Sequence, residues 1–145
     1  MRCVLGIDTS NYTTSAALFC PDDGRMIQQK MLLPVKPGER GLRQSDAVFH
    51  HTVQLPQIMS RLFAEAGDVS VAAIGVSEKP RLVDGSYMPC FLCGTGLAES
   101  LSAVTSAAVH KTSHQIGHVL AALFSAGQLH LVNERFIAFH VSGGT

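Results

Sequence analysis

The sequence predicts one mixed α/β domain whose sheet begins with three antiparallel strands and carries packed helices. Two features lead to this prediction. Three strand-like runs follow one another closely at the start of the chain, and from residue 45 onward helical apolar periodicity alternates with short apolar runs. The chain has 145 residues, 46% of them hydrophobic and 15% charged, which is enough for a real hydrophobic core.

The three opening strands are expected at residues 3–8, 13–20 and 26–33. The segment between the second and the third, Pro-Asp-Asp-Gly-Arg, is rich in turn-forming residues. Connections this short join antiparallel strands, because a parallel crossover needs about a dozen residues or more. We therefore expect an antiparallel meander whose first strand ends at Asp8, with this carboxylate facing a site.

A first helix is expected from Ser45 to Gly67, after a loop rich in proline and glycine. Ser45 or Asp46 is suited to cap its N-terminus, and Gly67 is suited to end it. Pro56 lies inside this helix, where a proline removes one backbone hydrogen bond, so it should kink or interrupt the helix.

The rest of the chain should alternate between strand and helix. An apolar run at 71–77 is expected to be a buried strand, and helices are expected at about 91–108 and at 114–126, with a short strand around Val109. The segment 135–145 is expected to be a strand that runs into a Gly-Gly turn. Such a strand has no evident partner, so we interpret the chain as part of a longer protein.

The composition excludes some classes of function. The formal net charge is zero and like charges do not cluster, so a strongly basic face for nucleic acid is not expected. No stretch approaches the roughly 18 apolar residues of a membrane span, and the opening residues do not resemble a secretory leader. We therefore expect a cytoplasmic protein with free thiols at its four cysteines, Cys3, Cys20, Cys90 and Cys93.

The strongest chemical signal is His114-Gln-Ile-Gly-His118. Residues four apart lie one turn apart on the same helix face, so both imidazoles can reach one metal ion. The alternative is a pair of surface histidines on an amphipathic helix. The mechanism of zinc proteases with an H-E-x-x-H motif is not expected, because Gln115 stands where the general-base glutamate is needed.

Two further segments could bind a ligand. The hydroxyl-rich turn at 8–15 could offer N–H groups to a phosphate, with Asp8 holding hydrated magnesium, or it could be an ordinary polar hairpin. The pair Gly143-Gly144 could let a ligand approach the backbone, or it could form an ordinary hairpin turn.

The remaining cysteine and histidine residues are interpreted as structural. Cys90 and Cys93 have redox spacing, but a second cysteine pair is missing and apolar residues lie between them, so they are expected to fill the core. His50, His51 and His140 are expected to be partly buried without a chemical role.

Several short motifs follow one another along the chain: Leu5-Gly-Ile-Asp-Thr-Ser10, Gln54-Leu55-Pro56, His114 with Gly117-His118, and Val141-Ser-Gly-Gly144. In this order and spacing they resemble the tRNA threonylcarbamoyladenosine transferases (TsaD/Gcp), formerly labelled glycoproteases or O-sialoglycoprotein endopeptidases. The resemblance runs the length of the chain, but it corresponds to the first half or less of a full family member.

The resemblance implies the fold of actin and Hsp70, in which two ribonuclease-H-like lobes enclose a cleft. Residues 1–133 would form the amino-terminal lobe, and residues 134–145 would begin the second lobe. It also implies one divalent metal ion, iron or zinc with magnesium as a further candidate. His114 and His118 would bind this ion, together with an aspartate of the second lobe.

Other site residues follow from the same resemblance. The segment His140, Val141, Ser142, Gly143 and Gly144 matches the family's substrate-contacting segment, and Asp8 and Ser10 would face the cleft. The implied reaction transfers a threonylcarbamoyl group from threonylcarbamoyl-AMP to N6 of the adenosine beside the tRNA anticodon. The implied partners are therefore tRNA and threonylcarbamoyl-AMP, with a related-lobe protein as a further partner and no membrane.

The chain departs from the family pattern at three positions. Thr145 stands where the family usually has histidine after the Gly-Gly pair, and Ser113 and Ile116 replace a histidine and a glutamate around the metal motif. We therefore interpret the chain as a divergent paralogue. We expect it to be inactive alone, because half of the cleft and the third metal ligand implied by the resemblance are absent from it. The alternatives are a non-catalytic actin-like lobe that acts by dimerisation and the metal-dependent O-sialoglycoprotein endopeptidase of the historical label.

Overall fold

The computed structural model describes residues 1–35 and 41–141. A five-stranded mixed sheet with the strand order β3-β2-β1-β4-β5 forms its centre. The first three strands pair antiparallel, as the sequence predicts, and β4 and β5 run parallel to β1, which makes the sheet mixed. The strands are β1 (Arg2–Ser10), β2 (Thr13–Cys20), β3 (Arg25–Leu32), β4 (Ser70–Lys79) and β5 (Ala108–Ser113).

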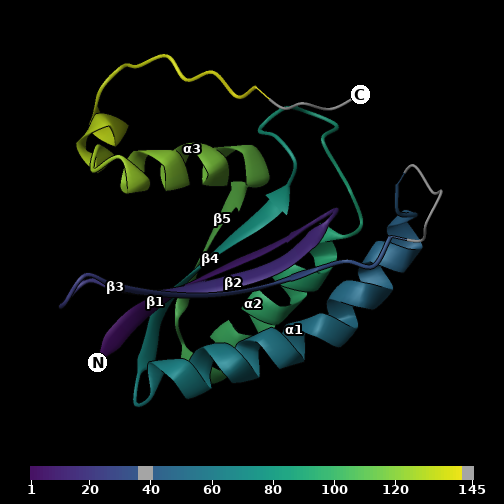
Figure 1. Cartoon of the computed structure of the whole chain (residues 1–145), viewed down its shortest axis with the longest axis horizontal. Helices are drawn as coiled ribbons and strands as arrows, with labels where there is room; N and C mark the ends of the chain where they lie inside the picture. Colours follow the sequence, from purple (N-terminus) through teal and green to yellow (C-terminus); the bar gives the residue numbers. More distant parts are fainter. Residues whose placement is uncertain (36–40, 142–145) are drawn as a thin grey trace.

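The helices lie on both faces of this sheet. Helices α1 (Gln44–Ala66) and α2 (Phe91–Thr105) cover one face, where α1 packs on β2 and β3 and α2 packs on β4 and β1. Helix α3 (His114–Ser125) lies on the opposite side (Figure 1), and a short 3-10 helix, η1 (Leu129–Asn133), follows it. None of the described helices is both long and apolar enough to cross a membrane.

The alternation of side chains along β1 assigns each residue to one of these two layers. Cys3, Leu5, Ile7 and Thr9 are buried and face α1 and α2. Asp8 points to the other face of the sheet, where α3 lies. The central strand therefore supplies core residues to one layer and a carboxylate to the other.

Helix α2 approaches β1 very closely at Gly94. The hydroxyl of Thr9 donates a hydrogen bond to the carbonyl of Cys90 (2.9 Å) and accepts one from the N–H of Gly94 (3.1 Å). A Cβ atom at Gly94 would lie 2.9 Å from Thr9 Oγ1 and 3.3 Å from Ile7 Cγ2. Glycine is thus required here for packing.

We expect the substitution Gly94→Ala to destabilise the protein by about 1–3 kcal/mol, because overpacking would push α2 away from β1. Gly96→Ala is a matched control on the same helix, since a Cβ there meets no atom of the described residues within 4 Å. The free energy of unfolding of this control should rise by up to about 1 kcal/mol, because alanine has a higher helix propensity than glycine. Denaturant unfolding of the two variants measures the difference, and equal effects would contradict the packing argument.

Several element boundaries differ from those predicted. Helix α1 begins at Gln44 with Arg43 as its N-cap and no side-chain capping bond, so the prediction of Ser45 or Asp46 as the cap is wrong. The helix also continues through Pro56 without interruption. Only one backbone N–H is lost at that position, and the buried face of the helix continues on both sides of it.

Later in the chain, one helix ends earlier than predicted and one predicted strand is confirmed. Helix α2 ends at Thr105 rather than near residue 108, because Ser106 adopts a left-handed conformation (φ 60°) that closes the helix. The short strand predicted around Val109 is present as β5.

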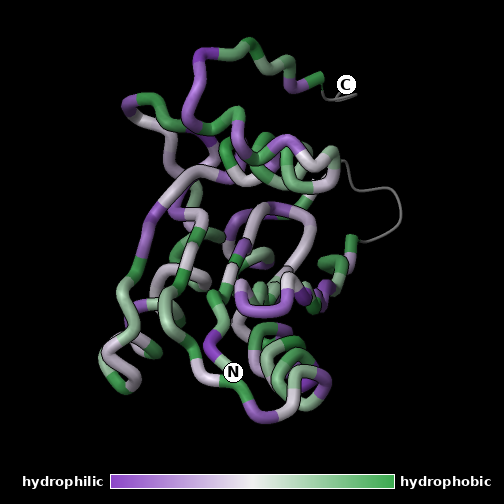
Figure 2. The backbone as a smooth tube through the Cα atoms, turned by 90° about the vertical axis from the view of Figure 1, so that its left-hand side faces the viewer, coloured by the Kyte–Doolittle hydropathy of each residue, from purple (hydrophilic) through white to green (hydrophobic). Residues whose placement is uncertain are grey.

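The predicted final strand is wrong for the part of it that the structure describes. Residues 135–141 form no regular element, since no strand of the described chain lies beside them. Figure 2 shows green, apolar residues recurring in the part of the chain just before the C-terminus, and Ile137, Phe139 and Val141 are more than four-fifths exposed. Residues 142–145 lie outside the described residues, and the proposed division at residue 133 stays a prediction.

The cysteines also differ from expectation. Cys3 and Cys20 lie on the paired strands β1 and β2, both are fully buried, and they form a disulfide. The prediction that all four cysteines are free thiols is therefore wrong. Cys90 is buried and Cys93 half-buried, both without a disulfide, and burial raises the pKa of Cys90 to about 11. This environment agrees with a packing role for these two residues.

Candidate metal centre

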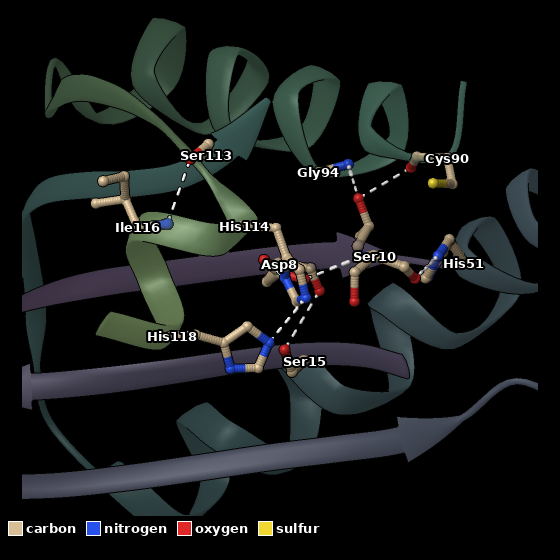
Figure 3. Close-up of polar contacts among 11 residues, drawn as sticks. Asp8, Ser10, Ser15, His51, Cys90, Gly94, Ser113, His114, Ile116 and His118 are labelled. Atoms are coloured by element: carbon tan, nitrogen blue, oxygen red, sulfur yellow. Dashed lines mark hydrogen bonds and ion pairs between the residues drawn. The ribbon is translucent and has the colours of Figure 1, made fainter. Parts of the chain in front are cut away.

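The two histidines of the predicted metal motif converge in the structure. Both lie in the first turns of α3, and their Nε2 atoms are 2.9 Å apart. Figure 3 shows the two rings turned toward each other and toward β1. The hydroxyl of Ser113 caps this helix by accepting a hydrogen bond from the N–H of Ile116 (3.3 Å). Ser113 and Ile116, two positions that depart from the family pattern, thus fix the start of the helix.

Asp8 orients the first of these histidines. Its Oδ2 lies 2.9 Å from Nδ1 of His114, and its Oδ1 accepts a hydrogen bond from the N–H of Ser10 (3.0 Å). A carboxylate can only accept when ionised, so Nδ1 of His114 carries the proton and Nε2 of the neutral ring keeps its lone pair. This is the arrangement in which a carboxylate holds a metal-binding histidine in the correct tautomer.

The topology explains why these residues meet. The strands β1, β4 and β5 are parallel, so their carboxyl ends lie along the same edge of the sheet. Asp8 lies near this end of β1, Ser77 near the end of β4, and His114 follows β5 directly. Ligands of open α/β sheets bind at this edge. The candidate site therefore lies at the edge of the sheet where folds of this class usually bind their ligands.

The charges of the site are coupled. Burial acts to raise the pKa of Asp8, but hydrogen bonds with His114 and Ser77 outweigh it, so this pKa lies below its ordinary value of 3.8. The hydrogen bond to Asp8 raises the pKa of His114. Burial and the neighbouring rings of His114 and His140 lower the pKa of His118. His118 is therefore the histidine of the pair that more readily offers a neutral ring.

The residues fit a divalent ion that prefers nitrogen ligands. Two imidazoles on one tetrahedral ion have nitrogens roughly 3.3 Å apart, for bonds of about 2.0–2.1 Å. The separation of 2.9 Å between the Nε2 atoms of His114 and His118 needs only a small opening to reach this value. Among residues 1–35 and 41–141, no three His, Cys, Asp or Glu residues form a metal-binding group. An ion held by this pair would need its further ligands from outside these residues or from solvent.

The predicted substrate segment is only partly described. The ring of His140 stacks on that of His118 with centroids 5.4 Å apart and an interplanar angle of 19°. Val141 is 90% exposed, and Ser142, Gly143 and Gly144 lie outside the described residues. The stacking brings one end of the predicted substrate segment beside the histidine pair, and a role in substrate binding stays a prediction.

Ser10 contributes through its backbone. Its N–H binds Asp8, and its carbonyl accepts a hydrogen bond from Nε2 of His51 (2.9 Å). The sequence signals identified Asp8 and His114 separately but did not predict their contact. A period-2 assignment of β1, which places Asp8 opposite the core residues, could have indicated that this side chain faces a different layer.

Comparisons with known proteins agree with this architecture. No family model matches the chain. A tRNA N6-adenosine threonylcarbamoyltransferase of Methanopyrus kandleri is 24% identical over 125 residues, which are 85% of this chain and 35% of that protein. The resemblance to this transferase family is confirmed. The chain spans about a third of the length of this curated relative.

Solved structures confirm the fold. YeaZ from Pseudomonas aeruginosa has a TM-score of 0.63 and 22% identity, over 88% of this chain and 51% of that one. A structure described as an uncharacterised protein with similarity to peptidase YEAZ from Pseudomonas aeruginosa has the same TM-score and identity, over 50% of its own chain. The chain therefore has the actin-like, ribonuclease-H-like lobe that the sequence resemblance implies.

The Asp8–His114 pair predicts a pH dependence of stability. The raised pKa of His114 stabilises the folded state fully below the ordinary value of 6.5, and this contribution is lost as the pH rises through the raised pKa. The lowered pKa of Asp8 stabilises it above 3.8, and that contribution is lost as the pH falls through the lowered pKa. The pair should therefore contribute most between these two ordinary values.

We expect Asp8→Asn to lower the free energy of unfolding by up to about 1 kcal/mol near pH 6 and by less near pH 9. Thermal unfolding at the two pH values measures this difference. Asp22→Asn, at an exposed position in the turn after β2, is the control and should show no such dependence. An equal loss for Asp8→Asn at both pH values would contradict a charged pair.

Proposed function

We propose that the chain contributes to a metal-dependent centre that transfers a threonylcarbamoyl group to tRNA. The observation that carries this proposal is the convergence of the Nε2 atoms of His114 and His118, with Asp8 holding Nδ1 of His114. The reaction is that of the M. kandleri relative, a tRNA N6-adenosine threonylcarbamoyltransferase. Because the substrate is tRNA, the proposal places the protein in the cytoplasm.

In this reaction, N6 of adenosine forms a bond to the carbamoyl carbon of threonylcarbamoyl-AMP. The bond between that carbon and the phosphate oxygen breaks, AMP leaves with the electron pair, and the proton released from N6 passes to solvent. A bound divalent ion would supply Lewis-acid polarisation of the substrate's oxygens. Imidazole ligands suit iron or zinc, whereas magnesium prefers oxygen ligands, so we favour iron or zinc.

In this proposal, the residues of this chain hold the metal ion and orient its ligands. His114 and His118 supply two nitrogen donors from one helix face, and Asp8 keeps the lone pair of His114 directed away from the sheet and toward His118. The segment from His140 to Gly144 would contact the substrate. The third ligand and the opposite wall of the cleft are not among the described residues, so we propose that this chain alone does not complete the reaction.

Binding of the proposed partners would involve more than the described residues. A formal net charge of zero leaves tRNA to be bound mainly by other segments or by a partner protein. For a related-lobe protein, the described residues offer an apolar groove of about 370 Å³ between α1 and α2, lined in part by Leu55, Met59, Leu97 and Leu101. Such a partner stays a prediction.

A transfer assay tests the proposed function. The complete gene product is incubated with threonylcarbamoyl-AMP, iron or zinc and unmodified tRNA, and modified adenosine is measured by mass spectrometry of nucleosides. We expect product with the wild type and a loss on the order of 100-fold in His118→Ala. His130→Ala replaces an exposed histidine away from the pair and should keep activity. Full activity of His118→Ala, or cleavage of a sialoglycopeptide instead of transfer, would overturn the proposal.

A further inference from the structure

His51 lies on α1 and is fully buried, on the opposite side of the sheet from the histidine pair. Its Nε2 is 2.9 Å from the carbonyl oxygen of Ser10, and its Nδ1 is 2.7 Å from the hydroxyl of Thr14. A carbonyl can only accept, so Nε2 carries a proton and donates it to Ser10. The last residue of β1 is thus tied to the helix layer beneath it.

The same hydroxyl also binds Gln54. Oγ1 of Thr14 lies 2.7 Å from Oε1 of Gln54 and equally close to Nδ1 of His51, so its single proton serves one of these two acceptors at a time. Nε2 of Gln54 donates to the carbonyl of Leu32 (3.0 Å). These bonds connect α1 to β1, β2 and β3 through one buried polar network. A network of this kind is costly to leave incomplete and fixes its members when it is complete. His51 is the member that reaches the end of β1.

The contacts continue from Ser10 to the candidate metal centre. The N–H of Ser10 donates to Oδ1 of Asp8, and Oδ2 of Asp8 lies against Nδ1 of His114. Figure 3 shows His51 and Asp8 on either side of Ser10 and the histidine pair beyond Asp8. We propose that His51 is a positioning residue for this centre, which fixes Ser10 and, through Asp8, the tautomer and orientation of His114.

Two different anchors hold this end of β1. Thr9 faces α2 and binds Cys90 and Gly94, whereas the carbonyl of Ser10 binds His51 on α1. Only the second anchor acts on the residue whose N–H holds Asp8. The loss of His51 should therefore affect the Asp8 carboxylate more strongly than its contribution to stability alone would suggest.

The predicted effect on metal affinity rests on the proposed function. The tautomer of His114 is therefore measured as well, because that measurement needs no metal. Nitrogen-15 NMR of the His114 ring near pH 9, above the ordinary imidazole range, reports whether Nδ1 or Nε2 carries the proton. We expect wild-type His114 to hold its proton on Nδ1. In His51→Leu we expect a mixture of both tautomers, together with a loss of zinc affinity of about 10-fold.

Two variants separate positioning from stability. His51→Gln places an amide nitrogen near the position of Nε2, so it should keep the bond to Ser10 and retain the wild-type tautomer and affinity. Gln54→Leu removes another member of the same network that does not touch Ser10, and it should lower the melting temperature without changing the His114 ring. A double-mutant cycle with Asp8→Asn should show that the two effects are not additive.

The outcomes are distinct. An unchanged tautomer in His51→Leu, or equal effects of His51→Leu and Gln54→Leu on His114, would overturn the positioning role. A changed tautomer in His51→Leu, combined with no zinc binding by the wild type in the complete gene product, would support the positioning role and contradict the proposed function.

Discussion

Replacing His114 with alanine is expected to lower the affinity for zinc or ferrous iron by on the order of 100-fold or more. The substitution removes one of the two described donors, and it also frees Asp8 from its ring partner. The affinity is measured on the complete gene product by competition with a chromophoric chelator. His118→Ala removes the second donor and leaves the Asp8 contact in place, so a comparison of the two variants shows how much the carboxylate contributes.

The control for this prediction is His130→Ala in η1, which removes an exposed histidine outside the pair. Its metal affinity should equal that of the wild type. Unfolding curves without metal should show that His114→Ala is folded, because its ring lies at the partly exposed start of α3 and outside the main core. A folded His114→Ala protein with wild-type affinity would remove the basis for a metal centre at this position.

Much of the fold could be predicted from local patterns. The strand spacing before residue 33 allows only antiparallel connections, and the apolar runs of β1, β2, β4 and α1 became buried strands or the inner face of a helix, whereas α3 has no buried residue. The exceptions have local physical causes. Pro56 did not break α1, because tertiary packing of the buried face outweighs the loss of one hydrogen bond, and the segment 135–141 is not a strand because it has no partner in the described chain.

The candidate site could be predicted only in part. The spacing of His114 and His118 depends on helix geometry alone, and it was therefore visible in the sequence. The contacts of Asp8 with His114 and of His51 with Ser10 join residues 106 and 41 positions apart. Contacts of this kind depend on strand order and on which face of the sheet each helix covers, and a single sequence does not specify either one.

The disulfide is another long-range contact that could not be predicted from the sequence alone. Cys3 and Cys20 meet because β1 and β2 pair in a register that places Val4 opposite Phe19. The compartment expected from the composition favours free thiols, but the two sulfur atoms are fully buried and thereby protected from reductants in solution. The formation of this disulfide therefore depends on strand pairing, which the number and spacing of cysteines in the sequence do not predict.

We expect Cys20→Ala to lower the free energy of unfolding by about 3 kcal/mol, because the cross-link closes a loop with a sequence separation of 17 and restricts the unfolded chain. Denaturant unfolding without reductant measures the change. Cys90→Ala is the matched control, since Cys90 is equally buried but unpaired, and it should lose only packing energy.

Thiol counting tests the pairing itself. Alkylation of the denatured, unreduced protein should modify two cysteines, Cys90 and Cys93, and prior reduction should raise the number to four. Alkylation of all four cysteines without reduction would show that the strands hold two thiols rather than a disulfide. In that case Cys20→Ala should cost no more than Cys90→Ala, because both substitutions would then remove only a buried thiol from the core.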